Sequence, residues 1–461
     1  MIARNELPVV VIGAGPVGLA AAAHLLERNL DVLVLEAGPT AGTSVISWGH
    51  IRLFSPWRYN IDAAARRLLE GTGWLEPDLG ANPTGAELVR DYLAPLAATP
   101  ELASRTRVGH RVVGVTRQGA DKTRSLGRER RPYLVRAITE DGQVVDVLAR
   151  AVLDASGTFA QSNPLGDGGL PALGERAALT SGSITGALPD VLGVGRARFE
   201  GRTTLVVGMG HSAANTLLSL VDLAEQNAAT RIVWAIRGGS ARRLFGGGKD
   251  DELPARGLLG TRLQEATESG RITLMKRTAL EELVGEGAAL RVRGSSRGEA
   301  FDMVVDNVVN ATGFRPDLGI LREVRLYLDP VVESPSRLAE LIDPNHHSCG
   351  TVPPHGEALL RHPDDGFYLV GMKSYGRAPT FLLATGYEQV RSIAAHLAGD
   401  RAAADAVELN LPATGVCSTD LAENGEESAC CGVSRPVRLP EPVGFANGVL
   451  HGRSGDLLAG N

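Results

Sequence analysis

Cysteine is scarce in this chain of 461 residues. Its four cysteines, Cys349, Cys417, Cys430 and Cys431, all lie in the last quarter of the sequence. Structural disulfides of a secreted protein are usually spread through its fold, so this distribution favours a reducing, cytoplasmic setting. Because residues 1–348 contain no cysteine, that part of the chain cannot carry a redox-active pair of thiols.

An uninterrupted hydrophobic run and a surplus of positive charge are also lacking. The longest apolar stretch, "VVVIGAGPVGLAAAAHLL", contains three glycines and a proline, so we expect a strand, a turn and a helix rather than a membrane or export segment. A net charge of -6 and a pI near 6.0 give no broad basic surface, so nucleic acid is not an expected partner. The basic run "RSLGRERR" at 125–132 predicts a solvated hairpin.

What the chain does contain is a strand–turn–helix–strand pattern that occurs twice. With 43% hydrophobic residues the chain can bury more than one core. Apolar spacing predicts this pattern at 8–36 and again from 201 to 237. Alternating residues at 110–155 predict a small antiparallel meander between the two copies. The fold class expected is therefore α/β, with two Rossmann-like dinucleotide-binding domains.

The first copy has the features of a dinucleotide site. Gly13, Gly15 and Gly18 form G-x-G-x-x-G after a strand and at the opening of a helix, where a tight turn and a close approach of pyrophosphate require glycine. Glu36 ends the second strand and can accept hydrogen bonds from a ribose diol. The alternative is a glycine turn of another doubly wound protein, with Glu36 only a strand-end carboxylate. The further residues assigned to this site are Pro16, Ala37 and Arg52.

The second copy has a basic residue where the first has an acid. Gly208 and Gly210 repeat the turn, and Ala213 replaces the third glycine. Arg237 stands about where Glu36 stood, and a guanidinium there can bind a 2′-phosphate, which favours NADPH over NADH. Alternatively, Arg237 belongs to an exposed basic loop. The residues assigned from the first helical turn are His211 and Ser212.

The two sites, with "DASGTF" at 154–159 and "NATGFRPD" at 310–317, resemble those of the two-dinucleotide-domain flavoproteins, such as thioredoxin-reductase-like enzymes and flavin-containing monooxygenases. The resemblance covers about residues 8–400 and implies FAD at the first site and NADPH at the second. It places the A-[ST]-G segments near the cofactors, and the N-terminus of the last helix near the flavin pyrimidine. The residues it assigns are Ala155, Ser156, Gly157, Ala311, Thr312, Gly313, Gly371, Ala384, Thr385 and Gly386. The domains it implies are 1–180 for FAD, 181–315 for NAD(P)H, 316–400 for the return of the FAD domain, and a loosely ordered tail at 401–461.

Two departures narrow the expected function. The redox-active cysteine motifs of thioredoxin-reductase relatives are absent from residues 1–348, and the F-x-G-x-x-x-H motif of flavin-containing monooxygenases is absent before Gly208. The segment "WGHIRLFSPWRYNID" at 48–62 nevertheless resembles a stretch found in bacterial monooxygenase-like flavoproteins. We expect a monooxygenase-like FAD-dependent NAD(P)H oxidoreductase that uses oxygen and a small soft or nucleophilic substrate, with no assigned catalytic side chain. The alternatives are a reductase of a disulfide, quinone, thiophilic metalloid or protein partner, and a redox-sensing flavin-binding module.

Two clusters of possible metal ligands remain. His346, His347, Cys349 and His355 do not match a defined zinc spacing, so a structural or substrate-lining loop is favoured there. Cys417, Cys430 and Cys431 could bind a soft ion or a trivalent metalloid, or could be inert. The sequence is also similar, weakly, to bacterial flavoproteins associated with arsenic resistance.

Overall fold

The computed structural model describes residues 6–245, 254–343, 352–379 and 381–409, and the expected α/β class is confirmed. The strands are β1 (Val9–Ile12), β2 (Val32–Leu35), β3 (Thr106–Arg107), β4 (His110–Arg117), β5 (Tyr133–Thr139), β6 (Val144–Ala149), β7 (Ala151–Asp154), β8 (Ile184–Thr185), β9 (Thr203–Val207), β10 (Arg231–Ala235), β11 (Thr273–Met275), β12 (Thr278–Glu286), β13 (Ala289–Ser296), β14 (Glu299–Val305), β15 (Asn307–Asn310) and β16 (Phe367–Leu369). The α-helices are α1 (Pro16–Glu27), α2 (Thr43–Ile46), α3 (Ala63–Glu70), α4 (Gly85–Leu88), α5 (Ala94–Ala97), α6 (Pro100–Ala103), α7 (Glu175–Thr180), α8 (Arg196–Phe199), α9 (His211–Gln226), α10 (Arg242–Phe245), α11 (Pro254–Glu268), α12 (Ser336–Ile342), α13 (Glu357–Leu360), α14 (Leu383–Leu397) and α15 (Arg401–Asp405).

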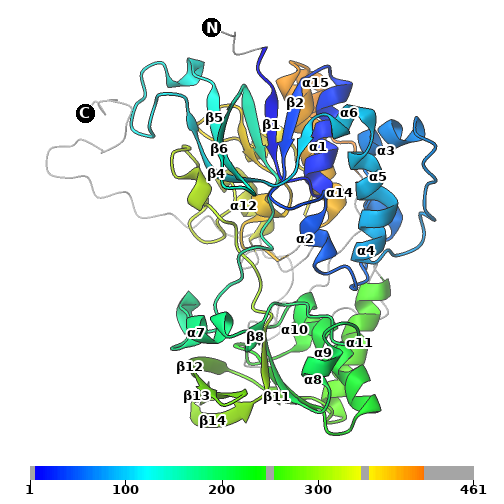
Figure 1. Ribbon diagram of the computed structural model, residues 1–461, viewed down its shortest axis with the longest axis vertical. Helices are drawn as coiled ribbons and strands as arrows, with labels where there is room; N and C mark the ends of the chain where they lie inside the picture. Colours follow the sequence, from blue (N-terminus) through cyan, green and yellow to red (C-terminus); the bar gives the residue numbers. More distant parts are fainter. Residues whose placement is uncertain (1–5, 246–253, 344–351, 380, 410–461) are drawn as a thin grey trace, which may run out of the picture. The chain divides into compact units, whose positions relative to one another are not determined.

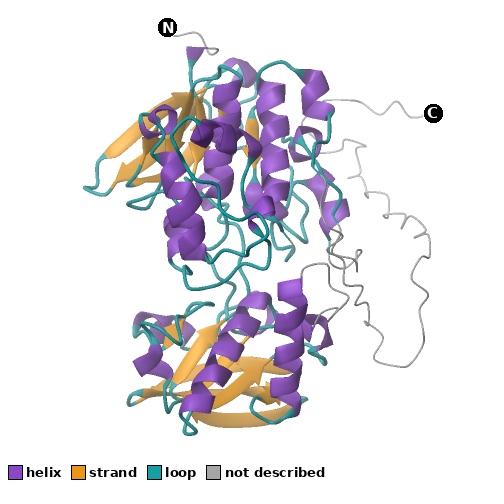
Figure 2. Cartoon of the chain, turned by 90° about the vertical axis from the view of Figure 1, so that its right-hand side faces the viewer, coloured by secondary structure: helices purple, strands orange, loops and turns teal. Residues whose placement is uncertain are grey.

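The first parallel sheet has the order β16-β7-β1-β2-β3. Strands β1 and β7 are buried along their whole length, as central parallel strands covered on both faces should be. Ile12 lies opposite both Leu35 and Asp154, so β1, β2 and β7 end at one edge. Helix α1 has an alanine-rich stretch that is fully buried, which lets α14 pack against it. Figures 1 and 2 show these helices alongside the strands.

The second parallel sheet repeats this arrangement. Its order is β8-β15-β9-β10-β11, in which β15, β9, β10 and β11 correspond to β7, β1, β2 and β3. The edge strand β8 differs from β16, because it precedes the other strands of its sheet in the chain whereas β16 follows them. Helix α9 connects β9 to β10, as α1 connects β1 to β2, and its bounds agree with the sequence expectation of His211 to Gln226. The duplication inferred from sequence therefore extends to four of the five strands in each parallel sheet of the described chain.

Each parallel sheet is accompanied by a three-stranded antiparallel sheet. The first, β4-β5-β6, confirms the expected meander, but its last strand ends at Ala149. The stretch expected to belong to the meander up to 155 divides at Arg150, after which β7 enters the parallel sheet. The second, β12-β13-β14, was not anticipated from sequence. Its exposed faces carry charged residues that form ion pairs across strands, such as Arg293 with Glu282 at 2.8 Å.

The C-terminal segment begins in an ordered way. Residues 401–461 were expected to be loosely ordered, yet Arg401–Asp405 forms helix α15, which packs on α14. Arg391 of α14 explains this order, because its buried guanidinium donates a 2.8 Å hydrogen bond to the carbonyl of Ala403 and also bonds the carbonyl of Ala406. Residues 410–461, with Cys417, Cys430 and Cys431, lie outside the described residues.

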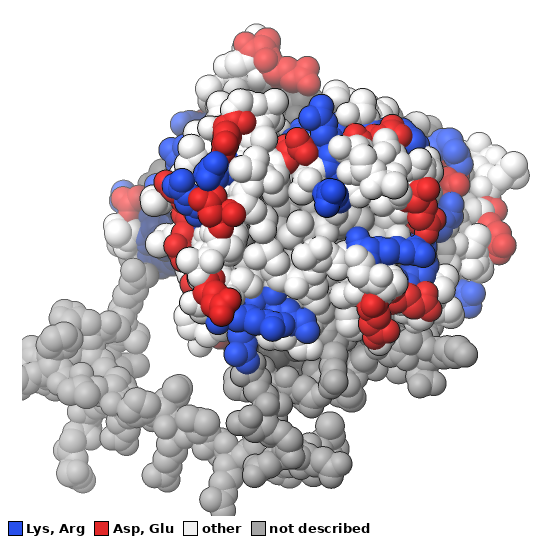
Figure 3. Space-filling model, turned by 90° about the horizontal axis from the view of Figure 1, so that it is seen from below, with Lys and Arg blue, Asp and Glu red and all other residues white. Residues whose placement is uncertain are grey.

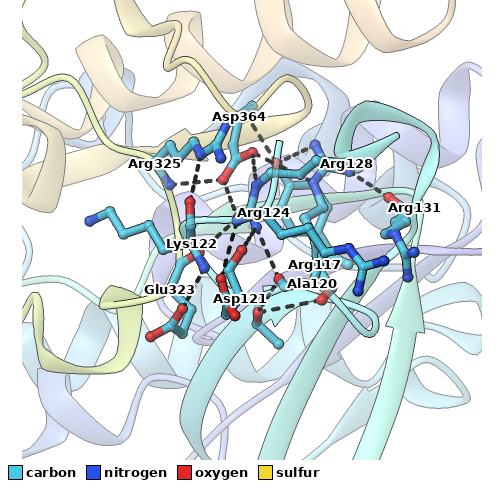
Figure 4. A network of polar contacts seen from close by, with 12 residues as sticks. Arg117, Ala120, Asp121, Lys122, Arg124, Arg128, Arg131, Glu323, Arg325 and Asp364 are labelled. Atoms are coloured by element: carbon cyan, nitrogen blue, oxygen red, sulfur yellow. Dashed lines mark hydrogen bonds and ion pairs between the residues drawn. The ribbon is translucent and has the colours of Figure 1, made fainter. Parts of the chain in front are cut away.

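The basic run at 125–132 is only partly solvated. Arg128 is buried, and its Nε and Nη2 atoms each donate a 2.8 Å hydrogen bond to the carboxylate of Asp364 (Figure 4). Burial raises the pKa of that carboxyl, but the hydrogen bonds from Arg128 and from the backbone N–H of Arg325 outweigh it and hold the pKa below its ordinary value. This correction to the sequence expectation has a simple cause, since the partner of Arg128 lies 236 positions away.

The surface shows charges of both signs. In Figure 3 Lys and Arg groups are interspersed with Asp and Glu groups on the face in view. Among the helices described, none is both long and apolar enough to cross a membrane.

Two buried histidines make the stability of the fold depend on pH. Burial lowers the pKa of His355 and of His362 to about 4, from an ordinary value of 6.5. Between pH 6.5 and 4 the unfolded chain therefore takes up protons that the folded chain does not, so the free energy of unfolding falls as pH falls. Each histidine contributes roughly 3 kcal/mol to this loss at pH 4.

We predict that His362→Asn gives a shallower decline of stability between pH 6.5 and 4, measured by urea unfolding. An asparagine oxygen can replace Nδ1 as the acceptor of the 3.2 Å hydrogen bond from the backbone N–H of Tyr327, but it does not titrate. A variant with the same slope as the wild type would contradict the prediction.

Candidate dinucleotide sites

The first glycine turn has the geometry that a pyrophosphate site requires. Gly13 has a φ of +98°, and a Cβ there would lie 2.9 Å from the carbonyl oxygen of Ala155. A Cβ on Gly18 would lie 1.9 Å from the carbonyl oxygen of Gly13. Around Gly15 the reverse holds, since a Cβ would meet nothing within 4 Å. Gly15 precedes Pro16, the first residue of α1, so this open space faces the positive end of the helix.

Glu36 lies beside this turn. Its carboxylate accepts a 2.7 Å hydrogen bond from the backbone N–H of Ala14 and another of 2.7 Å from that of Gly38. These bonds hold the carboxylate next to the glycine turn and leave lone pairs for further donors. Ala37 follows at the same edge and is half-buried. The position fits a ribose partner, which remains a prediction.

Arg52 lies in the segment after the first site. Its side chain is 61% exposed, forms an ion pair of 3.7 Å with Glu87 and donates a hydrogen bond to the carbonyl of Asn82. These contacts tie it to the start of α4, and its role toward a cofactor also remains a prediction.

The second glycine turn repeats the first. Gly208 has a φ of +136°, and a Cβ there would lie 2.0 Å from the carbonyl oxygen of Ala311. A Cβ on Gly210, which precedes α9, would again meet nothing within 4 Å. Ala213 is fully buried, so the helix tolerates a methyl group where the first site has Gly18. The ring centroid of His211 lies 5.0 Å from that of Phe54, and Ser212 is half-buried beside it.

A pocket opens at the ends of β9 and β10. It is lined in part by Gly208, Met209, Arg237, Thr278 and Thr312. A crevice at the carboxyl ends of the strands is where doubly wound sheets bind ligands. Arg237 is exposed, so its guanidinium is available to a bound molecule. The second site thus combines an open glycine turn, a helix N-terminus and a cation.

The two A-[ST]-G segments form matching turns. Asp154 Oδ1 accepts hydrogen bonds from the backbone N–H of Ser156 at 3.1 Å and from its hydroxyl at 2.6 Å. Asn310 Oδ1 accepts the same two bonds from Thr312, at 3.2 Å and 2.6 Å. Gly157 and Gly313 then follow with positive φ.

The first of these turns includes a buried ion pair. Lys373 Nζ donates to Asp154 Oδ2 at 2.7 Å and to the hydroxyl oxygen of Ser156 at 3.0 Å. Both charged side chains are fully buried. Sequence reasoning missed Lys373, because nothing local marks it; its partner lies 219 positions earlier.

The return segment is held by a second buried network. Gly371 begins the short 3-10 helix η8 (Gly371–Tyr375), and its N–H donates a 2.8 Å hydrogen bond to Gln389 Oε1. The amide nitrogen of Gln389 donates to Ser374 and to Nε2 of His355, both at 2.9 Å. Gln389 was not assigned from sequence, whereas His355 was considered there only as one of four possible metal ligands. The residues expected near the flavin, Ala384, Thr385 and Gly386, lie in the first turn of α14.

Of the four possible metal ligands in the His346–His355 loop, only His355 lies among the described residues. His355 is buried in the Gln389 network, whereas His346, His347 and Cys349 lie outside the described residues. Within the described ranges, no group of three or more His, Cys, Asp or Glu side chains could hold a metal ion.

Comparisons with known proteins agree with this geometry. Residues 8–164 match the family model described as FAD dependent oxidoreductase. Bacillithiol disulfide reductase Bdr (YpdA) from Bacillus cereus has a similar fold, with a TM-score of 0.63 and 17% identity over 85% of this chain and 99% of that one. The cadaverine monooxygenase DfoA from Erwinia amylovora gives 0.58 and 13% over 88% and 98%, and the Kutzneria ornithine N-hydroxylase KtzI gives 0.57 and 16% over 87% and 100%. No curated protein sequence matches the chain.

We predict that Gly15→Ala and Gly18→Ala fail in different ways. The open space at Gly15 accepts a methyl group in the ligand-free fold. Gly15→Ala should therefore lose bound flavin, measured by visible absorbance, while its flavin-free form keeps the melting temperature of the flavin-free wild type. Gly18→Ala would force its Cβ onto the carbonyl of Gly13, so the fold itself should lose stability. Full flavin content in a folded Gly15→Ala variant would contradict the assignment of this turn.

Proposed function

Because residues 8–164 match the family model described as FAD dependent oxidoreductase, we propose that the chain is an NADPH-dependent flavoprotein monooxygenase acting on a small nucleophilic substrate. The observation that carries the proposal is the presence of two matching dinucleotide sites in one chain. Each has a glycine at a helix N-terminus around which there is open space. FAD supplies the redox chemistry when bound, accepting hydride from the nicotinamide and passing electrons to oxygen.

The residues of the first site fit FAD. Open space at Gly15 admits the pyrophosphate, while the N-terminus of α1 offers backbone N–H groups and a positive potential. Glu36 is positioned by the N–H groups of Ala14 and Gly38 to accept the ribose hydroxyls. The turn at Ser156 and Gly157 lies at the same edge, since Asp154 is opposite Ile12.

The residues of the second site fit NADPH. Arg237 lies two residues beyond β10, one position later than Glu36 lies beyond β2, and lines the pocket next to Gly208. A guanidinium attracts the 2′-phosphate that distinguishes NADPH from NADH, whereas a carboxylate would repel it.

A monooxygenase is favoured over a disulfide reductase by the lack of cysteine. No cysteine occurs in the part of the chain that the structure describes, so thiol exchange beside the flavin has no nucleophile there. The similarity to a cadaverine monooxygenase and an ornithine N-hydroxylase makes amines the first substrates to test.

A reductase is the second candidate. The similarity to bacillithiol disulfide reductase favours it, because electrons could pass from reduced flavin to a disulfide, a quinone or a partner protein instead of oxygen. A metalloid acceptor, held by the cysteines of 410–461, is a special case. A redox-sensing module would bind the same cofactors with little turnover.

We predict that Arg237→Ala raises the KM for NADPH by about tenfold or more, since a charge-assisted hydrogen bond contributes roughly 1.5–3 kcal/mol. The KM for NADH should change little. Steady-state kinetics with both cofactors measures this, and Arg237→Lys, which keeps the charge but not the planar fork, should be intermediate. An equal change in the KM for NADPH and for NADH would contradict the assignment of Arg237 to the 2′-phosphate.

Product analysis separates the two candidates. With NADPH and oxygen, a monooxygenase should convert an amine from a panel that includes cadaverine and ornithine to a product 16 mass units heavier. A reductase should instead oxidise NADPH without oxygen when a disulfide or quinone is supplied. Acceptor-dependent anaerobic turnover, with no oxygenated product from any amine, would overturn the monooxygenase proposal.

A further inference from the structure

The ion pair between Asp154 and Lys373 requires an explanation beyond stability. Both side chains are fully buried, with 2.7 Å between Nζ and Oδ2. Taking two charges out of water is unfavourable, and a buried pair often stabilises a fold no more than apolar residues of the same size. Charge is also unnecessary for this turn, because the neutral Asn310 makes the same two hydrogen bonds to Thr312.

The contacts of the pair reach the FAD site on three sides. Asp154 and Lys373 both bond the hydroxyl of Ser156, an exposed residue at the carboxyl edge of the sheet. The backbone of Ala155 and Ser156 packs against Gly13, where a Cβ would be 2.9 Å from the Ala155 carbonyl oxygen. Helix η8, which carries Lys373, packs on the first turn of α1.

That last contact is close. A Cβ on Gly371 would lie 3.2 Å from Cγ2 of Val17, the second residue of α1. Lys373 therefore connects the return segment (residues 316–400) with the turn that follows β7. Through Gly371, the same segment also contacts α1, the helix that begins at the first glycine turn. Because Lys373 itself is fully buried, it acts on a bound molecule through these neighbours and not by direct contact.

We propose that Asp154 and Lys373 are positioning residues for FAD: their ion pair locks the exposed Ser156–Gly157 turn onto the return segment, so that the site is pre-organised before FAD binds. Pre-organisation raises affinity because less conformational freedom is lost on binding. The neutral turn at Asn310 lacks such a lock, since Asn310 Nδ2 donates to the backbone carbonyl of Asn163 instead. The inference rests on FAD occupying the first site, as the proposed function requires.

The test measures FAD affinity in folded apoprotein. Lys373→Met, Asp154→Asn and the double variant are titrated with FAD by fluorescence quenching, at a temperature where circular dichroism shows each to be folded. The double variant contains no unpaired charge, and its turn can close as it does around Asn310, so it carries the test even if a single variant does not fold. We expect its Kd to rise tenfold or more, and by less than the product of the two single effects.

A second buried ion pair gives the matched control. Arg128 and Asp364 are also buried and also join the first half of the chain to the return segment. Arg128 lies in the 3-10 helix η4 (Arg128–Arg130) between β4 and β5, and Asp364 precedes β16, at the end of the sheet opposite the glycine turn. The double variant Arg128→Met and Asp364→Asn should lower the melting temperature and leave the Kd for FAD within threefold of the wild type.

Either of two results would overturn the proposal: a rise of less than tenfold in the double variant of Asp154 and Lys373, or an equal rise in the control. If the wild type itself does not bind FAD, the proposed function fails as well, whereas wild-type binding with unaffected variants refutes the positioning role alone.

Discussion

The pairing of β16 with β7 is the constraint on which the first sheet depends. Phe367, Tyr368 and Leu369 lie opposite Val152, Leu153 and Asp154, after the chain has built a complete second sheet in between. Closing so long a loop costs conformational entropy. Pairing of only three residues in a parallel strand offsets little of that cost. Two buried ion pairs and the Gln389 network reinforce that junction. They lie where the chain returns, which is where additional interactions are needed.

The duplication of the two sheets makes their differences informative. Four strands of each sheet have the same order, and both sheets have the same open glycine before the first helix and the same Asx-type turn after the strand that follows the meander. The differences are chemical. At the end of the second strand of each βαβ unit, one copy has Glu36 and the other Arg237, and at the turn, one has Asp154 and the other Asn310. In the proposed function, these two sites of similar fold therefore offer opposite charges to FAD and NADPH.

Local features of this fold could be predicted from sequence, and long-range ones could not. Helix α9 and the turns at Gly13 and Gly208 follow from apolar spacing and from the steric demands of glycine, which act over a few residues. Lys373, Gln389 and Arg128 owe their roles to partners far away in sequence, so no local pattern marks them. A usable signal did exist for Asp154: "DASG" and "NATG" share an Asx residue two positions before the hydroxyl. The second meander could also have been predicted locally, because β13 alternates the buried Leu290 and Val292 with Arg291 and Arg293, whose charges lie on the other face.

The discontinuity of the first sheet has a consequence for biosynthesis. Residues 8–157 leave the ribosome long before β16 and α14 do. During that time β1, β2, β3 and β7 lack the edge strand β16, and α1 lacks the cover of α14. The second sheet is contiguous from Ile184 to Asn310 and can fold during that interval. The nascent chain can therefore complete its second parallel sheet before its first, which leaves the edge of β7 unpaired and open to aggregation in the meantime.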